Sequence, residues 1–304
     1  MCVSRRHILT GPAALSLTTL AGCTSLPVDS NHARHGQPEL AALHGFNRLA
    51  LFDDFSSLDT IDLHATGKSG YLWYPQGFMP GRTTPASAFS VSESVLTIAF
   101  DKPPNAHLWT VGYLGPQAPR YVGTLFEAGG YFEARMAFDP ALAAGQRTWP
   151  CFWMDDIEGI LADVDKTPTR FGELDFFEAF PHDKGKVDPL FSVHEWDKGA
   201  KTDIQNANYI AELGGVDFRE MHTYATLWLP MARNRGTGLI QRYFDGRHLE
   251  ALDVVYSASA PAPNGAIPAN PSGLFSILDD GRFTVALGTG LHWPAHYDDV
   301  QVWQ

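Results

Sequence analysis

Short runs of aromatic and β-branched residues recur along most of this 304-residue chain, separated by Gly, Pro, Asn and Asp. Such runs predict β-strands, because branched and aromatic side chains fit a pleated, half-buried sheet. Asp245-Gly246, between two of these runs, predicts a tight hairpin turn. We therefore expect an all-β protein, with one β-sandwich domain over residues 47–304. The predicted strands are Leu49–Phe55, Val95–Phe100, Gly130–Phe138, Glu173–Phe180, Thr223–Leu229, Leu239–Phe244, Phe283–Leu287 and Val300–Trp303.

The N-terminal segment has the pattern of an export signal. Arg5-Arg6 precedes the apolar run Ile8–Ala21, which is too short for a stable membrane span. Residues 1–22 thus resemble a twin-arginine signal peptide, and Leu20–Cys23 resembles a bacterial lipobox, in which Cys23 is acylated. The alternative is ordinary cleavage with Cys23 incidental. We expect 23–46 to be a polar tether and the protein to be exported, lipid-anchored to a membrane in the periplasm or at the cell surface.

Charge and cysteine content narrow the range of partners. The chain has 22 Lys and Arg against 34 Asp and Glu, a net charge of -12, so it lacks the basic footprint of a nucleic-acid-binding protein. There are three cysteines. Loss of Cys2 with the signal and acylation of Cys23 would leave Cys151 without a disulfide partner, as a small buried residue. We expect a monomer.

Three acidic residues fall within the segment Glu173–Glu178. In a regular strand Glu173 and Asp175 share one face, and Glu178 points to the other. A β-bulge at Phe176-Phe177 would return Glu178 to the first face. Three crowded carboxylates cannot all ionise easily, so their pKa values should separate. A retaining glycosidase needs that difference between its ionised nucleophile and its protonated acid. A solvated acidic strand edge is the alternative.

Two tryptophans, Trp149 and Trp153, come shortly before this acidic segment. Indole rings offer large rigid surfaces on which the apolar faces of sugars can stack. A single tryptophan in an all-β protein is more often part of the core. Two of them close to the acidic strand favour a sugar-binding platform.

The order and spacing of these motifs resemble glycoside hydrolase family 16, the group of laminarinases, lichenases and agarases. The resemblance covers residues 47–304 and implies a concanavalin A-like jelly-roll β-sandwich, with an open substrate cleft on the concave sheet. The segments that carry it are Gly130–Met136, Trp149–Met154, Glu173–Glu178, Leu51–Phe55, Met221–Tyr224 with Trp228, Tyr243–Gly246 and Asp298–Gln304.

The resemblance also implies roles for individual residues. Glu173 matches the nucleophile, Glu178 the general acid/base, and Asp175 the carboxylate that assists the nucleophile. For Arg135 a salt bridge with a carboxylate, and for Trp149 simple packing, remain open alternatives. The residues expected to bind substrate are Trp149, Trp153, His194, Arg135 and Trp73.

The bulged pattern E-x-D-x-x-E resembles the laminarinase and agarase branch of the family, so we expect an endo-acting hydrolase of β-1,3-glucan. Agarans and carrageenans remain alternatives, although sulfated chains suit an acidic protein poorly. Transglycosylation, or carbohydrate binding without turnover, also remains open. No cofactor is required by the resemblance. The resemblance also implies a structural Ca²⁺ held by Asp298, with Asp53 or Asp54 as a helper, and a simple acidic pair at a strand end is the alternative.

Overall fold

The computed structural model describes residues 36–76, 83–101, 106–143, 145, 148–157, 170–182, 186–197, 202–206, 209–210, 213–257, 276–290 and 292–304. The expected signal peptide, the lipidation site Cys23 and the first part of the expected tether lie outside these residues. No helix within the described ranges is both long enough and apolar enough to cross a membrane.

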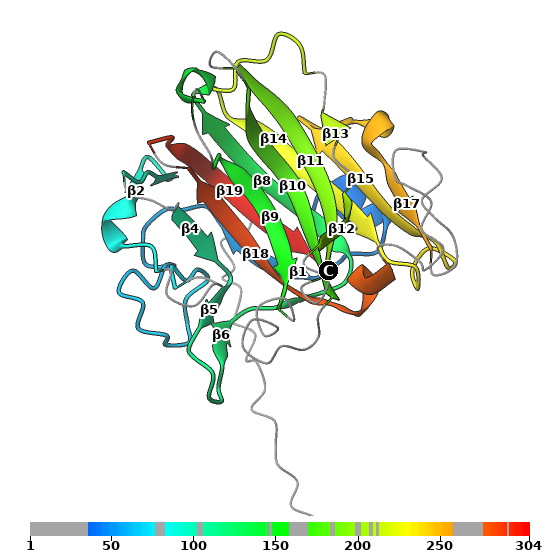
Figure 1. Cartoon of the computed structure of the whole chain (residues 1–304), viewed down its shortest axis with the longest axis horizontal. Helices are drawn as coiled ribbons and strands as arrows, with labels where there is room; N and C mark the ends of the chain where they lie inside the picture. Colours follow the sequence, from blue (N-terminus) through cyan, green and yellow to red (C-terminus); the bar gives the residue numbers. More distant parts are fainter. Residues whose placement is uncertain are drawn as a thin grey trace, which may run out of the picture.

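Two antiparallel sheets make up most of the fold (Figure 1). In the nine-stranded sheet the order is β16-β15-β14-β8-β19-β3-β2, with β1 on β19 and β17 on β15. Its strands are β1 (Leu49–Asp53), β2 (Phe89–Ser92), β3 (Val95–Ile98), β8 (Gly130–Phe138), β14 (His222–Leu229), β15 (Gly238–Phe244), β16 (Arg247–His248), β17 (Val254–Tyr256) and β19 (Ala295–Trp303).

The eight-stranded sheet has the order β12-β11-β10-β9-β18-β4, with β13 on β11 and β7 on β18. Its strands are β4 (Ala106–Trp109), β7 (Phe126–Glu127), β9 (Cys151–Asp156), β10 (Arg170–His182), β11 (Lys186–Asp197), β12 (Thr202–Asn206), β13 (Tyr209–Ile210) and β18 (Arg282–Thr289). Two further strands, β5 (Val111–Tyr113) and β6 (Tyr121–Gly123), form a separate two-stranded ribbon, and α1 (Glu39–Leu43) is a short α-helix. The described 3₁₀ helices are η2 (Ala86–Ala88), η3 (Pro140–Leu142), η4 (Glu250–Leu252) and η5 (Ser276–Asp280).

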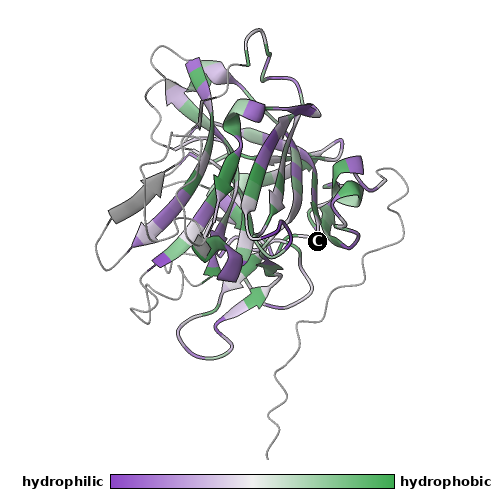
Figure 2. Cartoon of the chain, turned by 90° about the vertical axis from the view of Figure 1, so that its right-hand side faces the viewer, coloured by the Kyte–Doolittle hydropathy of each residue, from purple (hydrophilic) through white to green (hydrophobic). Residues whose placement is uncertain are grey.

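The main core lies between the facing sides of the two sheets. Phe132 of β8 stacks on Phe176 of β10 with ring centroids 4.7 Å apart, which joins the sheets directly. Both rings are fully buried, and burying a phenylalanine side chain stabilises a fold by roughly 1.5–3 kcal/mol. Hydrophobic and hydrophilic residues alternate along many of the strands, as Figure 2 shows. A strand with this alternation has one face for the core and one for solvent.

The strand predictions are confirmed, and so is the all-β class. The run Gly130–Phe138 coincides with β8, and the other seven expected runs fall on β1, β3, β10, β14, β15, β18 and β19. The hairpin turn is also confirmed. Asp245 has φ +47° and Gly246 has φ +72°, the left-handed pair that a two-residue type I′ turn requires.

The structure corrects the boundary that we placed between tether and domain at residue 46. The segment from Gln37 to Phe46 includes α1 and belongs to the folded unit. Ala41 and Phe46 are buried against Tyr131 and Trp303, on the outer side of the nine-stranded sheet. The apolar residues of this segment have no periodicity that marks a strand, and Leu40, Ala41 and Phe46 pack here because the outer side of the sheet is itself apolar at this place.

Candidate active site

The acidic segment lies on β10, and the bulge expected there is confirmed. The register between β10 and β11 shifts between Asp175 and Glu178. The register with β9 shifts between Asp175 and Phe177. Phe176 and Phe177 are both fully buried in the core. The extra residue thus lets two phenylalanines point inward, while Glu178 returns to the outer face of the eight-stranded sheet, the face turned away from the core.

Strand pairing places further side chains beside these carboxylates. Directly opposite residues of an antiparallel pair lie on the same face of the sheet. Three rows of directly opposite residues cross this outer face, and each row takes one residue from each strand that it crosses. Glu173 lies in a row with Thr284, Asp155 and His194. Asp175 lies in a row with Trp109, Ala286, Trp153 and Ser192, and Glu178 in a row with His107, Gly288, Cys151 and Leu190. A fourth carboxylate, Asp155, thus faces Glu173, which makes this part of the face strongly anionic.

Glu178 lies in an environment that favours its protonated form. Its pKa is raised well above the usual value, first by burial and then by the charge of Asp175. Trp149 donates its indole N–H to Oε1 of Glu178 over 2.6 Å, which acts in the opposite direction by stabilising the anion. Burial and like charge prevail, so Glu178 keeps its proton to a higher pH than an ordinary glutamate.

Glu173 has a different environment. Trp196 of β11 donates its indole N–H to Oε2 of Glu173 over 2.7 Å. The Trp196 ring is stacked on His194, with centroids 5.3 Å apart and the planes 9° from parallel. We did not predict Trp196. The signal was present in the sequence, because Trp196 is two residues from His194 and strand alternation places both on one face.

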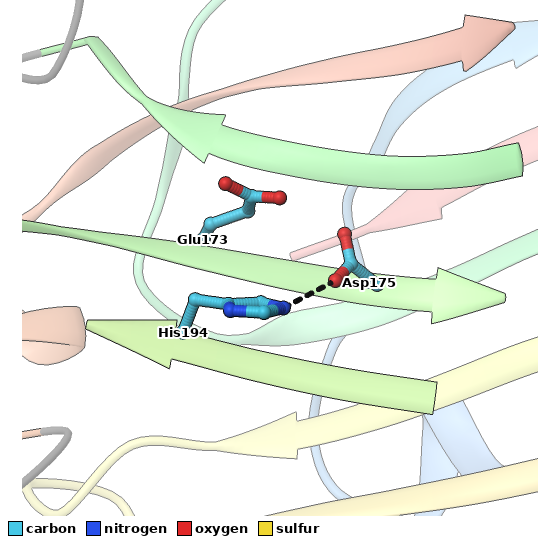
Figure 3. A group of neighbouring side chains, drawn as sticks. All are labelled: Glu173, Asp175 and His194. Carbon is cyan, nitrogen blue, oxygen red and sulfur yellow. Dashed lines mark ion pairs between the residues drawn. The ribbon is translucent and has the colours of Figure 1, made fainter. Parts of the chain in front are cut away.

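Asp175 lies between these groups and is almost inaccessible, with 2% of its side chain exposed. Its Oδ2 is 3.3 Å from Nε2 of His194. Figure 3 shows this ion pair, with Glu173 and Asp175 projecting from one strand and His194 from the next. The sequence thus identified four residues, Glu173, Asp175, Glu178 and His194, that the structure brings to one face.

Trp153 is partly exposed on the same face, opposite Asp175. Its ring is packed edge-on against Trp109, with centroids 5.0 Å apart. The His107 ring lies on the same side, with its centroid 6.0 Å from that of Trp153. Cys151 is buried with a free thiol, as expected, and burial raises the pKa of that thiol. Trp153 thus presents an aromatic ring beside the carboxylates, and the buried Trp109 supports it from below.

The structure corrects the role that we gave to Trp73. Its side chain is completely buried, and its Nε1 donates to Oδ2 of Asp53 over 2.8 Å. Its ring is packed near Phe55, with centroids 6.1 Å apart. A tryptophan with no exposed surface cannot stack on a sugar. Trp73 belongs to the core, and no local pattern distinguishes it from Trp153.

Arg135 also lies away from the carboxylate face. It is on β8, in the nine-stranded sheet, and it forms an ion pair with Asp298. Asp299 Oδ2 is 3.6 Å from the same guanidinium nitrogen. The alternative that we kept open for Arg135, a salt bridge with a carboxylate, is therefore confirmed. The cleft-side position that the resemblance implied for Arg135 is therefore wrong, because β8 belongs to the other sheet.

The residues expected to hold Ca²⁺ do not fit a shared site. Oδ1 of Asp53 accepts the Phe55 N–H at 2.9 Å, and its other oxygen accepts from Trp73. Burial raises the pKa of Asp53 to about 6. The charge of Asp298 is paired with Arg135. A calcium cage needs six to eight oxygen ligands, and these two carboxylates are already used. Within the described part of the chain, metal-ligand spacing is found at Glu173, Asp175 and His194 instead.

Comparison with known proteins agrees with this fold. No protein-family model matches the chain, and no curated protein matches it. Among solved structures, the GlcNAcα1-4Gal-releasing endo-β-galactosidase from Clostridium perfringens aligns with a TM-score of 0.50 at 13% identity. That alignment covers 84% of this chain and 62% of the galactosidase, so the chain spans less than two thirds of that protein.

Two further structures align over most of their own length. The endo-β-1,3-glucanase from Pyrococcus furiosus gives a TM-score of 0.49 at 16% identity, over 84% of this chain and 94% of the glucanase. Porphyranase B from Zobellia galactanivorans gives 0.47 at 16% identity, over 83% of this chain and 90% of the porphyranase. At such identities the likeness concerns the fold. The alignment with the endo-β-galactosidase shows that this chain shares its β-sandwich fold.

Proposed function

We propose that this protein is a retaining endo-β-glycoside hydrolase of the family 16 type. One observation carries the proposal: Glu173 and Glu178 lie on the same face of one strand in unlike environments. The pKa of Glu178 is raised well above its usual value by burial and by neighbouring charge. Glu173 receives an indole N–H from Trp196. A pair of carboxyl groups with different proton affinities is what double displacement at a sugar requires.

The proposed reaction has two steps. Glu173 attacks the anomeric carbon, the Trp196 N–H orients its carboxylate, and Glu178 gives its proton to the departing glycosidic oxygen. Glu178, now ionised and hydrogen-bonded by Trp149, then takes a proton from the water that releases the sugar from Glu173. The charge of Asp175, which raises the pKa of Glu178, helps Glu178 recover the proton for the next cycle.

We propose β-1,3-glucan as the substrate, bound across the outer face of the eight-stranded sheet. The pattern E-x-D-x-x-E, with its bulge, supports this choice through the laminarinase-like resemblance. The partly exposed Trp153 ring, packed on the buried Trp109, offers an apolar surface beside the carboxylates. A net charge of -12 disfavours sulfated polymers. Endo action follows if the polymer lies along the sheet rather than entering by an end.

The test is incubation of the purified protein with laminarin, mixed-linkage glucan, agarose, carrageenan and bacterial exopolysaccharides. New reducing ends and product sizes are measured together, and NMR of the first product reports its anomeric configuration. Glu173→Gln should abolish release, whereas Glu127→Gln, at an exposed position of β7, should not. Longer oligosaccharides at high acceptor concentration would favour transglycosylation. Binding to a polymer without release by the wild type would contradict hydrolysis.

We also propose that the protein is exported and lipid-anchored through Cys23, on the basis of the lipobox-like Leu20–Cys23. Metabolic labelling with a radioactive fatty acid tests this directly. The label should appear in the wild-type protein and be absent from Cys23→Ser, while Cys151→Ser keeps it. A wild-type protein that is exported but carries no label would indicate ordinary cleavage instead.

A further inference from the structure

Glu173, Asp175 and His194 hold three potential metal-ligand atoms within 4.8 Å of one another. They come from two adjacent strands, which fix their backbone positions: Glu173 faces His194 directly, and Asp175 follows two residues later on the same side of β10. Figure 3 shows the three side chains converging above the sheet. The cluster is therefore built on rigid elements and not on a loop.

The closest pair already has the spacing of two ligands on one ion. Zn²⁺ binds imidazole nitrogen and carboxylate oxygen at about 2.0–2.2 Å in tetrahedral geometry, so two of its ligand atoms lie roughly 3.3 Å apart. Asp175 Oδ2 and His194 Nε2 are 3.3 Å apart. A small side-chain movement of Glu173 would complete a three-ligand site with an open fourth position.

Asp175 supplies an independent indication of a missing ligand. Only 2% of its side chain is exposed, and within the described residues its Oδ2 accepts no hydrogen bond. Its ion pair with Nε2 of His194, 3.3 Å away, does not have hydrogen-bond geometry, and a buried carboxylate oxygen that accepts no hydrogen bond is costly. This oxygen is directed toward His194 (Figure 3), so a cation placed between the two residues would compensate it. Asp155, directly opposite Glu173 on the same face, adds negative potential there.

We propose that these three residues form a binding site for a transition-metal dication of the Zn²⁺ class, and that metal and sugar exclude each other. One nitrogen and two carboxylate oxygens suit Zn²⁺, Co²⁺ or Cu²⁺, whereas Ca²⁺ and Mg²⁺ prefer six or more oxygens. A metal on Glu173 occupies the carboxylate that would attack the substrate. This second part rests on the proposed function; metal binding itself does not.

The site is tested with Co²⁺, whose visible absorption reports ligand type and geometry without any turnover. The protein is purified without a polyhistidine tag and titrated, and His194→Gln and Asp175→Asn are titrated in parallel. His248→Gln is the matched control, because His248 is likewise a histidine paired with an aspartate. Its Nε2 lies 2.7 Å from Oδ1 of Asp253, on the nine-stranded sheet. Circular dichroism confirms that each variant is folded.

We expect about one Co²⁺ per wild-type chain, displaced by Zn²⁺ but not by Ca²⁺. Loss of a direct ligand should weaken binding by at least about tenfold, the smallest effect seen for lost outer-shell partners, whereas His248→Gln should bind as the wild type does. Failure of the wild type to bind, binding that survives in both His194→Gln and Asp175→Asn, or a thiolate-to-cobalt band would overturn the proposal.

Competition with substrate is measured separately. Zn²⁺ should raise the apparent KM without changing kcat, and laminarin oligosaccharides should weaken Co²⁺ binding. If the protein proves to have no hydrolase activity, the cobalt titration still decides the metal site. If hydrolysis occurs and Zn²⁺ lowers kcat without affecting KM, the proposed mutual exclusion of metal and sugar is wrong. The existence of the metal site is decided separately, by the cobalt titration.

Discussion

Trp149 donates its indole N–H to Oε1 of Glu178 over 2.6 Å. This bond favours the ionised carboxylate, whereas burial and the charge of Asp175 favour the protonated one. The pKa of Glu178 is therefore the outcome of opposed effects: Trp149, and after it the charge of His194, limit how far it rises. A residue that we expected to bind sugar thus also tunes the proposed proton donor.

Trp149→Phe removes this hydrogen bond and keeps an aromatic ring. Because the bond lowers the pKa of Glu178, its loss should raise that pKa further. The alkaline limb of kcat/KM, which reports loss of the proton from the acid, should then move to higher pH. The pH–rate profile on the best substrate measures this, with Trp73→Phe as the control that leaves the limb in place. A limb that moves to lower pH would exclude the tuning role.

Glu178→Gln should stabilise the fold at neutral pH. Folding raises the pKa of Glu178 above the value of 4.5, so the native state binds this proton more tightly than the unfolded state does. Stability from this group is complete below pH 4.5 and is lost as pH rises through the folded pKa. Glutamine cannot ionise and avoids that loss, and each 1 kcal/mol gained should raise Tm by about 2–4 °C.

Thermal unfolding of wild type and Glu178→Gln from pH 4 to pH 8 measures the effect. The difference should be small at pH 4 and should grow toward neutral pH. Asp217→Asn serves as a control with the opposite sign, since hydrogen bonds from Arg219 lower the pKa of Asp217 to about 2. A constant difference at every pH would show that packing, and not ionisation, separates wild type from Glu178→Gln.

Trp153→Ala should weaken substrate binding with little effect on the chemical step. The Trp153 ring is partly exposed beside Asp175 and rests on Trp109. Aromatic contacts of this kind contribute about 0.5–1.5 kcal/mol, so we expect KM to rise about 3- to 10-fold and kcat to change less than about twofold. Steady-state kinetics on oligosaccharides measures both constants. An unchanged KM would mean that the sugar does not reach this ring.

Trp73→Phe should lower the stability of the fold and leave catalysis unchanged. The Trp73 N–H is bonded to the buried carboxyl of Asp53, whose pKa is raised to about 6. Removing a hydrogen bond to a charged group costs about 1.5–3 kcal/mol, and the smaller ring leaves a cavity that adds to this loss. Urea unfolding should show the decrease while kcat/KM stays at the wild-type value. A fall in kcat/KM with unchanged stability would return Trp73 to the substrate site.

Much of the site was predictable because its information is local. Alternation along β10, interrupted once, placed Glu173, Asp175 and Glu178 on one face, and the buried pair Phe176-Phe177 explains the interruption. The hairpin at Asp245-Gly246 depended only on two backbone conformations. Trp196 was equally accessible to this reasoning, since it is two residues beyond His194 on the same strand. Missing it was an incomplete use of strand periodicity.

The errors share a different cause. Arg135 and Trp73 were assigned to the substrate face, yet Arg135 is paired with Asp298 on the nine-stranded sheet and Trp73 is buried against Asp53. Each error concerns which distant segment a residue meets. Asp53 and Asp298 were likewise grouped through neighbouring strands, although their side chains have separate partners.

The strands, the bulge and the set of carboxylates follow from local pattern, because side-chain direction in a strand repeats every two residues and depends on neighbours along the chain. The burial of Trp73, the pairing of Arg135 and the raised pKa of Glu178 arise only in the folded protein. Those properties depend on burial and on charges from strands far apart in sequence, such as β9, β10 and β11. Desolvation and Coulomb interactions act through space, so they are fixed only when the sheets have assembled.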